Sequence, residues 1–311
     1  MRYFTTIVMI FLTVLGLLLG QGKEYAGPED PAGDIAAERE GYMTGNRVFI
    51  YFRNTTELSD WPRVNVSKWP NNPNGLKMTD GIGLLVGAKV YIEDDGDAAT
   101  LDTIPLTEPA EIYTTDHHTL YYLQTSYREE MDTDPTGTVE WGFYPAFGYF
   151  NETGEYVAQS NLPGSWPSGG WPSTGFETKW PGEWNGRFGR GVIYADQESY
   201  FVVNDAQDQE YLGAEDNVKY FPRPGRYVGD LKPDVTIQPG VPWGGLGLRV
   251  AVRGFQWNNP QARDAIFWEY SIANISDYDL RDVAFGYWLD NSIGGDGDDD
   301  IGYFNKEVDM A

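Results

Sequence analysis

Apolar and polar residues alternate along several segments of the chain, and the clearest example lies in its last third. Leucine or valine occupies every even position of residues 246–253, with glycine, alanine or arginine between them. Successive side chains of a strand point to opposite faces, so this pattern predicts a half-buried β-strand. Further strands are predicted at 265–274 and 281–290, separated by the turn-forming residues 275–279. Three strands at this spacing predict an antiparallel meander.

The first half of the chain carries three further strand signals, at residues 47–53, 84–92 and 119–123. Composition supports β structure throughout, since 37 Gly, 19 Pro, 11 Trp, 21 Tyr and 15 Phe occur in 311 residues. Aromatic residues suit pleated surfaces, whereas Gly and Pro favour turns and disfavour long helices. The expected fold is an all-β antiparallel sandwich, either jelly-roll or immunoglobulin-like.

The middle of the chain, residues 143–190, shows neither the alternation of a strand nor the apolar spacing of a helix, and it is rich in Trp, Gly and Pro. Proline removes a backbone donor and restricts the residue before it, so a long loop packed by its own aromatic side chains is expected. The β-rich domain then covers 46–311, as one intertwined unit or as sub-domains 46–142 and 191–311. A polar leader, 23–45, precedes it, with one short helix candidate at 35–39.

The first 22 residues have the three-part layout of a secretory signal peptide. Arg2 precedes the apolar run 7–19, and small residues follow at Gly20 and Gly22. The run is shorter than the ~20 residues that a membrane-spanning helix needs, so cleavage is favoured over a membrane anchor. We therefore expect an extracellular or cell-surface protein whose mature chain has no transmembrane segment.

Net charge and the scarcity of reactive side chains exclude several classes of binding partner and of catalytic chemistry. The formal net charge is −25, which opposes binding to nucleic acid or to an anionic membrane. The chain has no cysteine and two histidines, which excludes thiol chemistry and leaves little histidine chemistry. No nucleophile motif or phosphate-binding glycine loop is found, so the sequence favours a non-catalytic protein over an enzyme.

The densest group of acidic residues follows the last predicted strand, between residues 290 and 302. Its carboxylates alternate with glycines, which would let them converge on a hard cation such as Ca²⁺. We name as candidate ligands Asp290, Asp296, Asp298 and Asp300. The loop is not an EF-hand, because Ile301 stands at the sixth position where the sharp turn needs Gly. The alternative is a solvated acidic turn.

The Trp-rich segment offers a second candidate site, made of Trp166, Trp171, Trp180 and Trp184. Exposed indole rings stack on the apolar faces of sugars and mark interaction surfaces. The alternative is that these rings fill the core of a loop-rich fold, since tryptophan is usually well buried. The two interpretations differ in the exposure of the rings.

Several short segments resemble a family of large secreted proteins from Bacteroidetes-related bacteria. They lie at residues 45–48, 67–70, 85–88, 195–200, 247–250, 267–274 and 290–303. These are strand and turn signatures, and the family brings no established catalytic residues. The resemblance implies a cell-surface or released protein exported by type IX secretion. Members often end in fibronectin-like modules and a sorting domain, which this chain lacks, so we expect it to be an N-terminal fragment.

Taken together, these patterns predict an exported structural or adhesive protein whose acidic loops are stabilised by Ca²⁺. The alternative is a carbohydrate-binding or carbohydrate-active module that uses the Trp-rich loop. The expected partners are polysaccharide or other surface proteins.

Overall fold

The structure of the chain is a computed structural model. It describes residues 37–60, 63, 66–92, 118–126, 132–133, 140–173, 176–180, 182–205, 219–220, 243–244, 246–274, 280–295, 300–303 and 305–307. The predicted signal peptide and most of the predicted leader lie outside these residues. Within them, no helix has the length and apolar character needed to cross a membrane.

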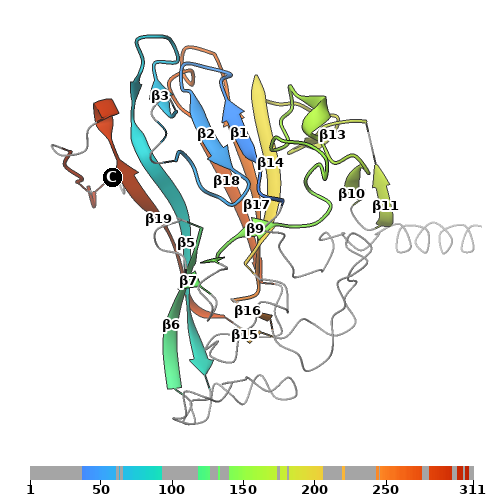
Figure 1. The fold of residues 1–311 in the computed structure, drawn as a ribbon, viewed down its shortest axis with the longest axis vertical. Coiled ribbons are helices and arrows are strands. Elements are labelled where there is room, and N and C mark those ends of the chain that lie inside the picture. Colours follow the sequence, from blue (N-terminus) through green and yellow to red (C-terminus); the bar gives the residue numbers. More distant parts are fainter. Residues whose placement is uncertain are drawn as a thin grey trace, which may run out of the picture.

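One antiparallel sheet has the strand order β18-β17-β14-β9 (Figure 1). Its strands are β9 Tyr144–Pro145, β14 Gln197–Asn204, β17 Leu248–Gln256 and β18 Phe267–Asn274. In β17, the even-numbered apolar residues recognised in the sequence are buried, as the alternation predicts.

A second antiparallel sheet has the order β19-β5-β6, and a hairpin of β1 and β2 lies beside it. Its strands are β1 Glu40–Met43, β2 Ile50–Arg53, β5 Thr79–Ile92, β6 His118–Thr125 and β19 Arg281–Asn291. Leu58 links the hairpin to the sheet through bridges to Phe52 and Ile82. The long strand β5 therefore organises this layer, with β19 on its outer side in Figure 1.

A common hydrophobic core lies between the two sheets. It includes Leu84 and Val86 from β5, Phe52 from β2, and Phe201 and Val250 from the opposite sheet. The rings of Phe52 and Phe201 stack with centroids 6.1 Å apart. Segments from both halves of the chain thus share one core, and the protein is an all-β antiparallel sandwich.

The predicted meander is only partly formed. β17 pairs with β18, but β19 pairs with β5 in the other sheet, with Tyr287 opposite Leu84 and Leu289 opposite Ile82. The chain passes from one sheet to the other between β18 and β19, because an alternating strand can bury its apolar face in either layer.

The start of the sheet also differs from the sequence-based expectation. Strand β1 begins at Glu40, inside the segment 23–45 that was expected to be a leader. Glu38 and Arg39 are not helical, so the helix expected over 35–39 does not extend through them. Cross-strand pairing with β2 outweighs the polar composition of this segment.

The middle segment folds into short hairpins over a smaller second core. Its elements are η2 Pro163–Ser165, β10 Trp171–Ser173, β11 Phe176–Trp180, β12 Asn185–Gly186 and β13 Gly189–Arg190. Other short elements are β3 Lys68–Trp69, β4 Leu76–Lys77, β7 Asp132–Thr133, β8 Glu140–Trp141, β15 Lys219–Tyr220, β16 Trp243–Gly244 and η4 Ile293–Gly295.

Candidate binding surface and acidic loop

The four tryptophans predicted as ligand residues pack against one another beside β14. Trp184 lies 5.8 Å from both Trp166 and Trp171, and Trp171 lies 6.3 Å from Trp180, measured between ring centroids. Trp171 and Trp184 are each only 1% exposed, and Trp166 and Trp180 are half-buried. They form a second core with residues of β14 such as Tyr200.

Each of these four indole N–H groups donates a hydrogen bond to a nearby acceptor. Trp166 donates to the carbonyl of Gln159 (2.7 Å), Trp171 to that of Glu183 (3.0 Å) and Trp180 to that of Pro172 (3.1 Å). Trp184 donates to the carboxylate of Glu198 at 2.6 Å. Buried rings with satisfied N–H groups are typical of packing, and the faces of Trp171 and Trp184 are closed to a sugar.

Glu198, on β14, is fully buried and connects this second core to the surface. Its Oε2 accepts the Trp184 indole, while its Oε1 accepts the backbone N–H groups of Tyr194 (2.5 Å) and Ala195 (3.0 Å). Three donors to one carboxylate compensate for its burial. The carboxylate thereby fixes the backbone that presents Tyr194.

A set of aromatic side chains that the sequence analysis did not single out lies on the surface next to this loop. We call it the aromatic strip, and it consists of Phe188, Tyr194, Trp257 and Phe267. Consecutive ring centroids lie 4.9, 5.7 and 5.5 Å apart, in edge-to-face arrangements. Phe188 is 64% exposed, Tyr194 61% and Phe267 47%, whereas Trp257 is half-buried.

The strip is held in place by backbone contacts as well as by ring packing. The indole N–H of Trp257 donates to the carbonyl of Tyr194 at 3.1 Å. Phe188 sits in the tight β12–β13 hairpin, where a Cβ on Gly186 would lie 1.7 Å from the carbonyl oxygen of Val192. Only glycine fits there, so the hairpin has a defined path and Phe188 a defined place.

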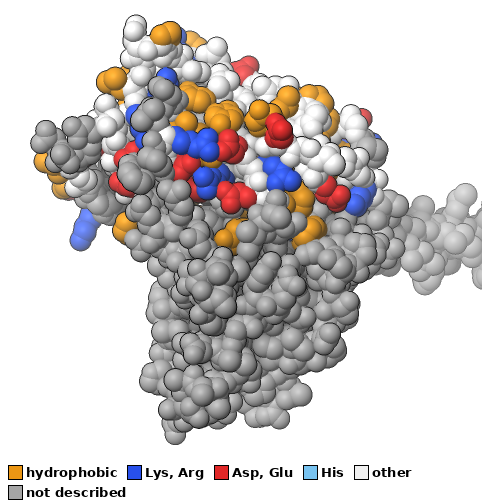
Figure 2. Space-filling view, in the orientation of Figure 1, with side chains coloured by type: hydrophobic (Ala, Val, Ile, Leu, Met, Phe, Trp, Pro, Cys, Tyr) orange, Lys and Arg blue, Asp and Glu red, His pale blue; other side chains and the backbone are white. Residues whose placement is uncertain are grey.

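Paired charges border the strip. The guanidinium of Arg187 lies 2.6 Å from the carboxylate of Glu269 and 5.8 Å from the ring of Phe188. Arg190 pairs with Glu183 in the same way. Figure 2 shows basic and acidic side chains similarly intermixed over the described part of one face, despite the overall charge of −25. The strip is therefore an apolar surface with a locally balanced border.

The acidic loop is described in part. Asp290 lies at the end of β19, where its backbone carbonyl accepts a hydrogen bond from the Thr79 hydroxyl at 2.7 Å. Asp300 Oδ2 accepts the backbone N–H of Ile293 at 2.8 Å. Asp296 and Asp298 lie outside the described residues. Within the described ranges, no three Asp, Glu or His side chains are placed to hold a metal ion. Calcium binding therefore stays a prediction.

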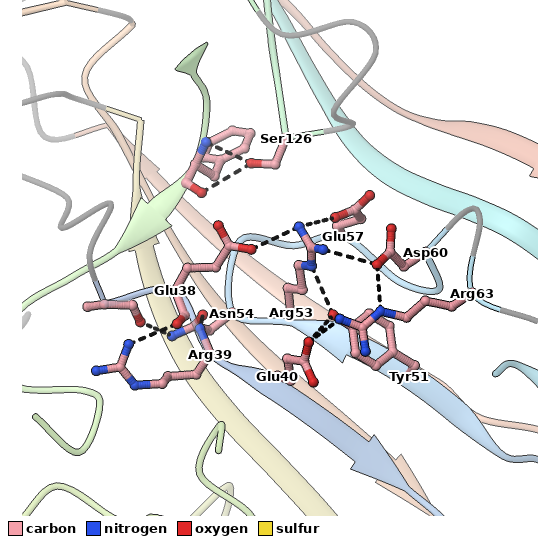
Figure 3. Close-up of polar contacts among 12 residues, drawn as sticks. Glu38, Arg39, Glu40, Tyr51, Arg53, Asn54, Glu57, Asp60, Arg63 and Ser126 are labelled. Atoms are coloured by element: carbon pink, nitrogen blue, oxygen red, sulfur yellow. Dashed lines mark hydrogen bonds and ion pairs between the residues drawn. The ribbon is translucent and has the colours of Figure 1, made fainter. Parts of the chain in front are cut away.

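A network of ion pairs lies on the outer side of β2 (Figure 3). The guanidinium of Arg53 contacts Glu38 (2.9 Å), Glu57 (3.5 Å) and Asp60 (3.0 Å), and also donates to the hydroxyl of Tyr51 (2.9 Å). Asp60 and Glu57 are buried. Buried carboxylates of this kind need such partners, and the network ties residue 38 to the loop after β2.

The second arginine of the network acts on Glu40. Arg63 pairs with Glu40 and with Asp60 (2.9 Å), and its guanidinium lies 4.6 Å from the ring centre of Tyr51. Burial raises the pKa of Glu40, but hydrogen bonds from Tyr42 and Arg63 and the charge of Arg63 outweigh it, so the pKa is lowered. Glu40 is thus held ionised, which suits a structural ion pair and not a general acid.

Asp205 lies just after β14 and is buried. Its two oxygens accept the backbone N–H groups of Leu246 and Leu248, each at 2.7 Å. Its own carbonyl accepts the side-chain amide of Gln124 at 3.0 Å. Complete burial raises the pKa of Asp205 to about 7, although the backbone N–H groups oppose this. Asp205 joins the ends of β14, β17 and β6, which is a structural role.

Comparison with protein-family models, with curated proteins and with solved structures finds no match to this chain.

Proposed function

We propose that this chain is an exported, non-catalytic adhesive protein that contacts its target through the aromatic strip. The observation that carries the proposal is the exposure of Phe188 and Tyr194 on a surface fixed from below by Glu198 and the Trp cluster. Aromatic side chains contribute most to binding when they are held rigid before contact. Export to the extracellular space or cell surface rests on the signal-like residues 1–22.

The polar groups described above support a binding role in preference to catalysis. The carboxylates of the network around Arg53 are paired with arginine, and Glu40 is held ionised. Glu198 is closed off by three donors. Each has a structural partner that a catalytic acid or base would have to give up.

Carbohydrate binding is a second candidate function, and the balanced border of the strip favours it. Neutral polysaccharides combine apolar ring faces with hydroxyl groups, so exposed aromatic rings beside polar pairs such as Arg187–Glu269 suit them. This candidate moves the sugar site from Trp171 and Trp184, which are buried, to Phe188 and Tyr194.

Binding to solid targets tests both candidates. The purified chain is mixed with cellulose, chitin and starch particles and with beads coated with collagen, and the bound fraction is measured. We expect the double variant Phe188→Ser, Tyr194→Ser to lose at least tenfold in affinity for the target that binds. The matched control is Leu76→Ser with Tyr156→Ser, which changes side chains of comparable exposure elsewhere.

The outcome separates the two candidates. Strip-dependent binding to particles alone supports carbohydrate recognition, and strip-dependent binding to the protein-coated beads supports adhesion. Binding that survives in the double variant, or no binding to any target, would overturn the assignment of the strip.

A further inference from the structure

An exposed tryptophan that belongs to neither the Trp cluster nor the aromatic strip lies on β3. Trp69 is 41% exposed, and its indole N–H donates to Oδ1 of Asp264 at 2.9 Å. The guanidinium of Arg47 lies 5.5 Å from the centroid of the ring. The edge of the ring is therefore fixed, while much of its surface stays open to solvent.

Hydrogen bonds hold together the three backbone segments that meet at this ring. The N–H of Arg47 donates to the carbonyl of Arg263 at 2.9 Å, and the N–H of Asn71 donates to the carbonyl of Arg47 at 2.6 Å. The side chain of Asn46, which is buried, donates to the carbonyl of Ala265 at 2.7 Å. The ring and its charged neighbours thus lie on backbone that is fixed before a ligand arrives, which lowers the entropic cost of binding.

Two guanidinium groups share the carboxylate of Asp264. Nη1 of Arg47 lies 2.9 Å from Oδ1 and 3.1 Å from Oδ2, and Nε of Arg263 lies 3.7 Å from Oδ2. A guanidinium has five N–H donors, so Nε and Nη2 of Arg47 and both Nη groups of Arg263 keep theirs. Within the described part of the chain these donors have no acceptor, and the two side chains are 41% and 46% exposed. They suit a ligand with acceptor oxygens.

The local charge is positive, although the whole chain carries −25. Arg47 and Arg263 contact the single carboxylate of Asp264, which leaves one net positive charge. Lys68 on β3 adds a positive charge nearby. Asp196, whose carboxylate accepts a backbone N–H of the loop before β18 at 2.6 Å, adds a negative one, so the balance is unchanged. Because salt screens charges beyond about 8 Å, an anion bound here interacts mainly with this local excess.

We propose that Trp69, Arg47 and Arg263 form a binding site for an acidic sugar, namely a hexuronic acid unit of a polysaccharide. The exposed indole stacks on the apolar face of the sugar ring. The open N–H groups of the guanidiniums pair with the carboxylate of the sugar. This site does not depend on the aromatic strip, whose bordering charges are balanced and suit a neutral ligand.

Isothermal titration calorimetry on the full chain tests the proposal. The probe is a short oligomer of galacturonic acid, and the control ligand is the same oligomer with its carboxyl groups methyl-esterified. The methyl ester keeps the sugar ring and removes the negative charge. All solutions contain EGTA, so that Ca²⁺ cannot bridge the acidic loop and the sugar carboxylates.

We expect the acidic oligomer to bind and its methyl ester to bind about tenfold more weakly, because the charge-assisted hydrogen bonds are lost. Trp69→Ala and Arg47→Gln should each weaken binding of the acidic oligomer by about tenfold, since each removes one kind of contact. Arg263→Gln should also weaken it. Because the Arg263 side chain is exposed and only approaches Asp264, this variant keeps the test valid should Arg47→Gln not fold.

Arg187→Gln is the matched control. Its guanidinium is likewise paired with a carboxylate, lies 5.8 Å from an aromatic ring and is 47% exposed, but it borders the strip. This variant and the Phe188→Ser, Tyr194→Ser variant should bind the acidic oligomer as the unmodified chain does.

Three results would overturn the inference. They are the absence of binding by the acidic oligomer, equal binding by its methyl ester, and an equal loss of affinity in Arg187→Gln, which would place the sugar at the strip. Because the strip variant retains Trp69 and both arginines, failure here is distinguishable from failure of the proposed adhesive function.

Discussion

The Trp-rich segment and strand β19 are both dense in aromatic residues, but they place them in opposite environments. Trp171 and Trp184 are buried, and their N–H groups have acceptors in the same segment or on β14. Phe285 and Tyr287 continue the apolar face of a sheet and remain largely exposed. Aromatic content alone therefore does not indicate where a binding surface lies. An aromatic ring is available for binding only where no other part of the protein covers it.

The largest effect is expected from the buried region. Trp184→Ala should destabilise the protein by about 4 kcal/mol, because it opens a cavity and leaves Glu198 without one of its donors. Urea unfolding followed by circular dichroism measures this change. A loss below about 1 kcal/mol would contradict the packing role of the Trp cluster. It would indicate that these rings are exposed in solution, as Phe285 and Tyr287 of β19 are.

A smaller effect is expected at Asp205, which is buried between the two sheets. Asp205→Asn should cost about 2 kcal/mol at pH 6, because one backbone N–H loses its acceptor. Its pKa of about 7 in the folded protein exceeds the ordinary value of Asp, so the folded state binds a proton that the unfolded state releases above about pH 4. The contribution of Asp205 to stability is therefore complete below about pH 4 and is lost as the pH rises to about 7.

Urea unfolding of the unmodified chain and of Asp205→Asn at pH 5, 6, 7 and 8 tests whether the stability contribution of Asp205 falls or rises with pH. The difference in stability between them should decrease from pH 5 to pH 7 and stay constant above it. A difference that increases with pH would mean that the backbone N–H groups hold Asp205 ionised instead.

Calcium binding to the acidic loop after β19 is expected to change the stability of the protein by less than Asp205→Asn does. Thermal unfolding in EGTA and then in millimolar Ca²⁺ should show a rise of roughly 3–4 °C, since about 1.4 kcal/mol follows when the ion is tenfold above its dissociation constant. Asp298→Ala with Asp300→Ala should abolish the rise. No rise in the unmodified chain would return these aspartates to the solvated-turn alternative.

The smallest effect is expected on the exposed face of β19. Phe285→Ser should change stability by less than about 0.5 kcal/mol, because the ring is mostly in water in both states. Comparing its urea midpoint with that of Trp184→Ala gives the contrast between the two regions directly. A loss above about 2 kcal/mol would show that this face is covered in solution.

Part of the candidate site could be predicted from local sequence and part could not. The density of Trp, Gly and Pro at 143–190 indicates a loop region packed by aromatic residues. It does not distinguish Trp184, which is buried, from Phe188, which is exposed. The aromatic strip combines residues 188, 194, 257 and 267, so no spacing along the chain could reveal it.

The sequence by itself determined the all-β class and the positions of the strands at 84–92, 246–253, 265–274 and 281–290. Alternation of side chains is a local property, because it follows from the geometry of a single strand. The tertiary structure alone decided that β19 pairs with β5 and not with β18, and that β1 begins inside the expected leader. Pairing depends on which apolar faces meet across the core, and many partners satisfy the same alternation.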